Sequence, residues 1–131
     1  MEAGKRLSGG EKQRLALCVA LGKEADYYFL DEPTKGMDAK SKKIFGELLK
    51  EWTKMGKSIV MVSHDMEFTA KYADEISLLY QGEIIVQCPV REFMEENQFY
   101  TTGMNRVTRR VNPHIITIED VKKYAKRKNS Q

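Results

Sequence analysis

The sequence predicts an α/β fold with parallel strands and flanking helices. Two short apolar runs, at residues 27–30 and 58–62, each end in polar or acidic residues, as buried parallel strands do when a site lies at their carboxyl ends. Between them, residues 39–55 place apolar side chains on one face and Lys and Glu on the other, the pattern of an amphipathic helix. A hairpin pattern follows. Strands alternating with helices indicate α/β layering.

A helix is expected near the start of the chain, from Ser8 to Gly22. Ser8 and Glu11 have the spacing of a helix-capping pair, apolar residues recur at helical intervals after them, and Gly22 can end the helix. The helix at 39–55 has Gly56 as its expected cap.

The later part of the chain changes character after Gln87. Before it, a short helix is expected at 66–72, and two apolar runs flank Gln81-Gly82 in the pattern of a β-hairpin. After it, we expect a small helical tail: a short helix at 89–96, no clear periodicity at 97–112, and a capped helix from Thr117. We therefore divide the chain into residues 1–87 and a carboxyl-terminal extension, 88–131.

Composition limits the possible classes of protein. A chain of 131 residues that is 41% hydrophobic can bury one modest core. Cys18 and Cys88 form no metal-binding or disulfide pattern, which fits a reducing cytosol. Neither a secretory signal nor an apolar run of roughly 18 residues is present, so we expect any membrane role to depend on a partner.

The net charge of +3 is unevenly distributed. Residues 98–131 contain eight Lys and Arg but two acidic residues, a net charge of +6. Few aromatic residues lie among these cations, and most of the lysines fall on the expected terminal helix. A solvated basic face is therefore favoured over a surface for nucleic acid or acidic lipid, and no nucleic-acid partner is expected.

Ser8, Gly9 and Gly10 have the composition of an anion-binding helix start. Glycines let backbone N–H groups approach an anion closely, and the helix dipole favours negative charge there. Taken alone, the same residues fit an ordinary glycine-rich N-cap equally well.

Asp31 and Glu32 follow the first strand, and His64 follows the second. One carboxylate could support magnesium, the other could polarise an attacking water, and an imidazole N–H could contact a phosphate. Alone, an acidic pair is usually a solvated strand end and a histidine is usually structural or exposed. The following Pro33-Thr34 and Gly36-Met37-Asp38 make the functional interpretation stronger.

In this combination the motifs resemble those of the ATP-binding-cassette (ABC) ATPases. LSGGEKQR, residues 7–14, resembles the signature motif; YYFLDEPT, residues 27–34, resembles the Walker B strand with the catalytic glutamate; GMD, residues 36–38, resembles the D-loop; and His64 resembles the switch histidine. The resemblance covers about Leu7 to Val86. It implies a partial P-loop NTPase fold with a terminal β-hairpin and a helical tail.

The resemblance also implies a role for each matching residue. Ser8, Gly9 and Gly10 would contact the γ-phosphate of ATP held on an opposing cassette, and Gln13 would belong to the same cofactor-binding set. Asp31 would support Mg²⁺, Glu32 would act as general base and His64 would contact the γ-phosphate. Asp38 would couple the two sites across the cassette dimer.

Three segments further resemble the ATPases of energy-coupling-factor importers, in particular the second cassette of a fused, two-cassette protein: residues 31–42, 99–102 and 118–121. The implied partners are a second cassette, separate or fused, a transmembrane coupling subunit and a substrate-binding membrane subunit. The implied activity is ATP hydrolysis at the cytoplasmic face of the membrane, powering uptake of a vitamin or metal ion.

The family's phosphate-binding loop, adenine-stacking aromatic and glutamine-bearing loop have no counterpart in this sequence. We therefore expect a fragment of a longer polypeptide that does not hydrolyse ATP alone; a natural half that functions by pairing is the alternative.

Two other classes of protein stay open. The first is half of a DNA-repair or chromosome-maintenance ATPase, against which Pro33-Thr34 counts. The second is a non-catalytic interaction module docked through the basic tail, against which the intact Asp31, Glu32 and His64 count.

Overall fold

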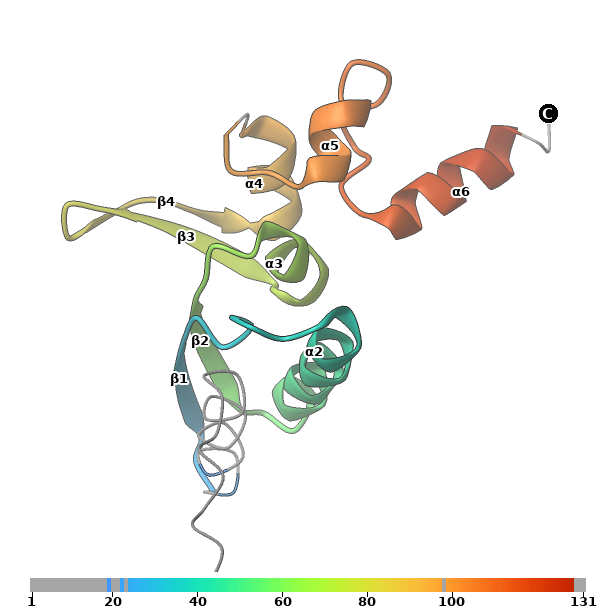
Figure 1. Ribbon diagram of the computed structural model, residues 1–131. Helices are drawn as coiled ribbons and strands as arrows, with labels where there is room; N and C mark the ends of the chain where they lie inside the picture. The colour runs from blue at the N-terminus through green and yellow to red at the C-terminus, as the bar shows by residue number, and fades with distance from the viewer. Residues whose placement is uncertain (1–18, 20–21, 23, 98, 129–131) are drawn as a thin grey trace, which may run out of the picture. The chain divides into compact units, whose positions relative to one another are not determined.

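A computed structural model of the chain describes residues 19, 22, 24–97 and 99–128. The described residues form two compact units, one up to His64 and the other from Asp65 onward (Figure 1). The expected helix between Ser8 and Gly22 lies almost wholly outside the described residues. The boundary after Gln87 between a cassette portion and an extension stays a prediction.

The first unit is built on a parallel pair of strands. β1, Tyr27–Asp31, and β2, Ser58–Val62, pair in register, with Tyr27 opposite Ser58 and Asp31 opposite Val62. The helix α2, Ala39–Lys54, makes the crossover between them. This arrangement confirms the predicted α/β class.

The helix α2 begins and ends where the sequence predicts. The Asp38 side chain caps its start by accepting a hydrogen bond from the Ser41 amide at 2.7 Å. The chain leaves the helix through Gly56, whose φ of +86° is a conformation that glycine adopts without strain. The centroids of the Trp52 and Tyr28 rings lie 4.5 Å apart, so the helix packs on the strand pair (Figure 1).

The strand pair is buried on one face only. Tyr28 and Leu30 are buried, whereas Tyr27 and Phe29 are 69% and 78% exposed, and Val60 beside Phe29 is 53% exposed. The expectation of two buried strands is therefore wrong for this face. Successive side chains of a strand point to opposite faces, and α2 packs against one of them.

The second unit starts with a helix and a hairpin. α3, Met66–Tyr72, is followed by β3, Glu75–Tyr80, and by β4, Glu83–Pro89, which pairs with β3 in antiparallel fashion. Gln81 and Gly82 have φ values of +49° and +86°, as a tight two-residue hairpin turn requires. Figure 1 shows a long two-stranded ribbon, which confirms the predicted hairpin.

The tail folds into three helices: α4, Val90–Glu96, α5, Gly103–Thr108, and α6, Ile118–Lys128. The helices α4 and α6 confirm the predicted short and capped helices, while α5 lies in the stretch without clear periodicity. Val90, Met94 and Ile116 form a buried cluster, and partly buried residues of α3 and β3 pack against it. The tail therefore shares one core with the elements that precede it.

Asn105 fixes the chain between α4 and α6. Its side chain is fully buried, and its amide nitrogen donates to the carbonyls of Pro113, at 2.7 Å, and Ile115, at 3.0 Å. The Thr101 hydroxyl donates to its Oδ1 at 3.2 Å. The Asn105 side chain thus donates hydrogen bonds to backbone carbonyls that lie outside any helix or strand.

Of the helices that the structure describes, none combines the length and apolar character that crossing a bilayer requires.

Candidate functional site

The candidate site lies where β1 and β2 end. Asp31 is opposite Val62 in the last pair of the parallel ladder, and the Glu32 amide donates to the Val62 carbonyl at 2.9 Å. The pairing thus continues one residue beyond the strand and brings Glu32 to the carboxyl end of β2. The carboxyl edge of a parallel sheet is where ligands of α/β folds bind.

Glu32 and His64 lie together at this edge. The His64 amide donates to Glu32 Oε1 at 3.1 Å, and His64 Nε2 lies 3.7 Å from the same oxygen. The backbone of Glu32 has a φ of +44°, which is unusual for a residue with a side chain and directs its carboxylate toward the next strand end. The structure thus brings together the predicted base and the predicted switch histidine.

The loop after Glu32 is a pair of consecutive turns. The Lys35 amide donates to the Glu32 carbonyl and the Met37 amide to the Thr34 carbonyl, both at 3.1 Å. Thr34 is buried, and Gly36 has a φ of +75° that the second turn requires. Asp38 then caps α2, so the loop from Glu32 to Asp38 is anchored at both ends.

The site is open to solvent. The His64 side chain is 94% exposed, and Asp31 is exposed as well. The Asp31 carboxylate has no hydrogen bond or ion pair with any residue that the structure describes, so its oxygens remain available to a ligand. An exposed carboxylate at this edge fits Mg²⁺, which keeps several of its waters and takes few protein oxygens.

No three His, Cys, Asp or Glu side chains gather into a metal-binding cluster within residues 24–97 and 99–128.

The predicted site residues Ser8, Gly9, Gly10 and Gln13 lie outside the described residues, and their roles stay predictions. Asp38 has a structural task that the motif alone does not reveal, because its carboxylate caps α2. The bond from the His64 amide to Glu32 was also not expected. The sequence signal for the cap was present, since Asp38 directly precedes the first residue of the helix.

Comparisons with known proteins agree with this geometry. A family model described as ABC transporter matches residues 1–35. A putative ABC transporter ATP-binding protein of Bacillus thuringiensis subsp. konkukian is 46% identical over 114 residues, which are 87% of this chain and 21% of that protein. The energy-coupling factor transporter ATP-binding protein EcfA2 of Thermotoga maritima is 33% identical over 100 residues, 75% of this chain and 38% of that protein.

A solved structure is similar as well. The ATP-binding cassette MJ0796, in a dimeric post-hydrolysis state bound to ADP and Pi, matches with a TM-score of 0.60 and 32% identity, over 66% of this chain and 37% of that one. The chain spans about a fifth of the length of the Bacillus relatives. Sequence, strand-end geometry and fold agree, and the matched residues are part of an ABC transporter ATPase domain.

Proposed function

We propose that this chain is the carboxyl-terminal half of an ATP-hydrolysing cassette in an ABC importer of the energy-coupling-factor type, which powers uptake of a vitamin or metal ion. The relatives described above are named as ABC transporter or energy-coupling factor ATP-binding proteins, which supports transport over DNA repair or chromosome maintenance. The observation that carries the proposal is the meeting of Glu32 and His64 at the carboxyl edge of two parallel strands.

Each side chain at this edge has a separate task in the proposed reaction. Glu32 accepts a proton from the attacking water through its carboxylate, which also holds the His64 amide. The exposed imidazole of His64 donates an N–H to the γ-phosphate. Asp31 holds Mg²⁺, which when bound supplies positive charge that offsets the charge developing on the phosphate oxygens.

The signature residues act on a second cassette. We propose that Ser8, Gly9, Gly10 and Gln13 contact the γ-phosphate of ATP held by that partner, with Asp38 coupling the two sites. The dimeric state named for the similar cassette MJ0796 supports this arrangement. Because Asp38 caps the start of α2, a shift of this loop at a dimer interface would be passed directly to the helix.

The second cassette is proposed to be part of the same polypeptide. The 114 aligned residues make up 21% of the Bacillus thuringiensis relative, so that protein is about 540 residues long, enough for two large domains. We propose that the complete protein lies at the cytoplasmic face of the membrane and assembles there with a coupling subunit and a substrate-binding subunit. No nucleic-acid partner is expected.

The proposal is tested by ATP turnover. We expect no phosphate release by the 131-residue chain alone, because the phosphate-binding loop has no counterpart in its sequence. We expect turnover after addition of a separate amino-terminal cassette half that carries a phosphate-binding loop. Glu32→Gln should abolish the turnover of the mixture, since an amide cannot accept the proton of the attacking water.

Glu51→Gln is the matched control, because Glu51 is exposed on α2 and the same change is made away from the strand ends. Turnover by the chain alone that is insensitive to Glu32→Gln would overturn the mechanism. Turnover of the mixture that both variants leave unchanged would remove Glu32 from the role of base.

A further inference from the structure

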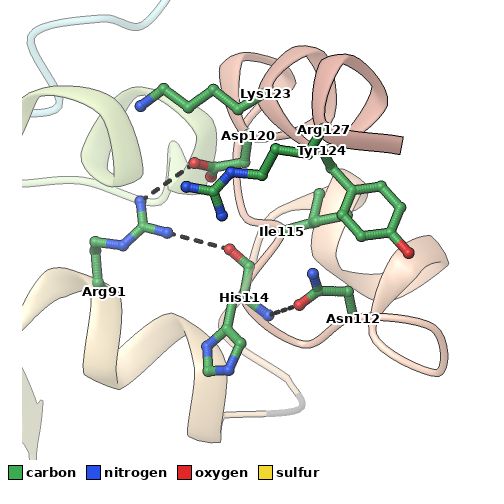
Figure 2. A pocket seen from close by; sticks show the side chains of 8 residues that line it. All are labelled: Arg91, Asn112, His114, Ile115, Asp120, Lys123, Tyr124 and Arg127. Atoms are coloured by element: carbon green, nitrogen blue, oxygen red, sulfur yellow. Dashed lines mark hydrogen bonds and ion pairs between the residues drawn. The ribbon is translucent and has the colours of Figure 1, made fainter. Parts of the chain in front are cut away.

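The second unit contains a pocket that the proposed ATPase site does not use. It lies between α4, the segment 112–116 and α6, and is seen from close by in Figure 2. Three cationic side chains line it, Arg91, Lys123 and Arg127, against one acidic side chain, Asp120. The pocket therefore carries an excess of positive charge.

Arg91 is fixed in place by two contacts. One guanidinium nitrogen donates to the His114 carbonyl at 3.1 Å, and another lies 3.6 Å from Asp120 Oδ1. A guanidinium has five N–H donors, so these contacts leave others to face the pocket. Because the side chain is already held, little conformational entropy is lost when it binds a ligand.

The Asp120 carboxylate accepts several hydrogen bonds at the start of its own helix, α6. Its Oδ2 accepts hydrogen bonds from the amides of Thr117, at 2.9 Å, and Ile116, at 3.2 Å, and from the Thr117 hydroxyl at 3.0 Å. Donors that point at this carboxylate offset part of its negative charge. Asp120 therefore orients Arg91 without neutralising the remaining cations of the pocket.

Lys123 and Arg127 have no hydrogen bond or ion pair with any residue in the part of the chain that the structure describes. They are four residues apart on α6, a spacing at which two like charges repel each other. Figure 2 shows Arg127 reaching across the pocket toward Asp120 and Arg91. An anion placed among the three cations would relieve this repulsion.

We propose that this pocket binds a phosphate-bearing group. A phosphate offers several acceptor oxygens, which match the planar fork of an arginine and the point charge of a lysine. The buried side chain of Ile115 forms an apolar part of the lining, which leaves room for the carbon portion of a phosphate ester. Such a group belongs either to a small soluble compound or to a lipid headgroup.

The test compares two variants of equal charge. Lys123→Gln with Arg127→Gln removes the two cations that α6 contributes to the pocket, whereas Lys122→Gln with Lys126→Gln removes two cations from the same helix that do not line it. Binding of inorganic pyrophosphate to the 131-residue chain is measured by calorimetry. We expect the pocket variant to bind at least about tenfold more weakly than wild type, because each charge-assisted hydrogen bond contributes roughly a factor of ten.

Sedimentation with vesicles distinguishes the two sources of phosphate. Phosphatidylcholine vesicles with and without phosphatidic acid are the probes. If the pocket variant loses binding of pyrophosphate and the control variant keeps it, the ligand is a soluble compound. The same pattern seen only with phosphatidic acid supports a lipid headgroup. Binding of neither probe, or equal loss in both variants, would overturn the proposal and leave a solvated basic face.

Discussion

The backbone amide of His64 donates a hydrogen bond to the Glu32 carboxylate, with 3.1 Å between the nitrogen and Oε1. The two residues follow neighbouring parallel strands, so the bond joins the strand ends beyond their last paired residues, Asp31 and Val62. The Glu32 side chain therefore has two tasks, holding the His64 amide and carrying out the proposed proton transfer.

This division of tasks predicts that two substitutions at Glu32 separate stability from catalysis. Glu32→Gln keeps an oxygen that can accept the His64 amide, so we expect its free energy of unfolding to stay close to that of wild type. Glu32→Ala removes the acceptor and should lower the free energy of unfolding by about 1 kcal/mol. Urea denaturation measures both values. A Glu32→Ala variant as stable as wild type would show that the hydrogen bond contributes nothing measurable.

The first unit could be predicted in large part because its signals are local. The apolar runs at 27–30 and 58–62 and the period of α2 are properties of neighbouring residues, and they yield the correct parallel pair and crossover helix. The apolar run does not reveal which face of the pair is covered, since Tyr27 and Phe29 are as apolar as Tyr28 and Leu30.

The sequence predicts where the site lies, but not the backbone conformation and the hydrogen bond that shape it. The two strand ends bring Glu32 near His64, as the sequence predicts. The positive φ of Glu32 could not be predicted, because this conformation is usual for glycine and asparagine but not for glutamate. The hydrogen bond between them depends on that backbone conformation.

The carboxyl-terminal tail could be predicted less completely, for a different reason. α5 is six residues long, too short for a helical period to appear, and Asn105 holds it through carbonyls eight and ten residues away. The core cluster joins Ile116 to Met66 and Ala70 of α3, partners that no local pattern relates. Such contacts arise from tertiary packing, which overrides weak local preferences.

Asn105 is predicted to be the most sensitive polar residue of the second unit. Asn105→Leu is similar in size but removes the amide donor of the part-buried Pro113 carbonyl and leaves the Ile115 carbonyl only the 3.4 Å hydrogen bond from the Thr108 hydroxyl. We expect the free energy of unfolding to fall by about 1–3 kcal/mol, the cost of an unsatisfied buried polar group. Gln87→Leu, at an exposed position of β4, is the control for added apolar surface. A loss no larger than that of the control would contradict the structural role of Asn105.

The stability of the tail is predicted to fall in acid. Burial alone would raise the pKa of Asp120, but hydrogen bonds from Thr117 and Ile116 and the charge of Arg91 together hold this pKa below its ordinary value of 3.8. Because the folded pKa is below the unfolded one, this stabilisation is complete above the unfolded value and is lost as pH falls through the folded value.

The check is a series of urea denaturations from pH 7 to pH 2. Asp120→Asn should lower the free energy of unfolding at pH 7, and the difference from wild type should shrink below about pH 4. Glu119 has a lowered pKa as well, chiefly through its 2.9 Å hydrogen bond from Lys71, but both side chains are substantially exposed. Glu119→Gln should therefore show a smaller change. A difference between wild type and Asp120→Asn that does not depend on pH would contradict the assignment.

The exposed face of the strand pair predicts that the 131-residue chain associates with itself. Phe29 and Val60 are opposite each other in the register, and both are more than half exposed on the face away from α2. Burying an apolar side chain of this size contributes about 1.5–3 kcal/mol, so two of them contribute enough to favour contact between copies. Sedimentation equilibrium should show a mass that rises with concentration.

Substitutions on this face test whether the self-association depends on it or on other exposed apolar surface. Phe29→Lys with Val60→Thr should weaken the association at least about tenfold, which corresponds to the loss of 1.4 kcal/mol or more. Ile44→Lys is the matched control, because Ile44 is similarly exposed but lies on α2. Equal weakening by both changes would mean that the association is not specific to the sheet. Since parallel sheets are normally covered on both faces, the segment that restores ATP turnover should also abolish the association by covering Phe29 and Val60.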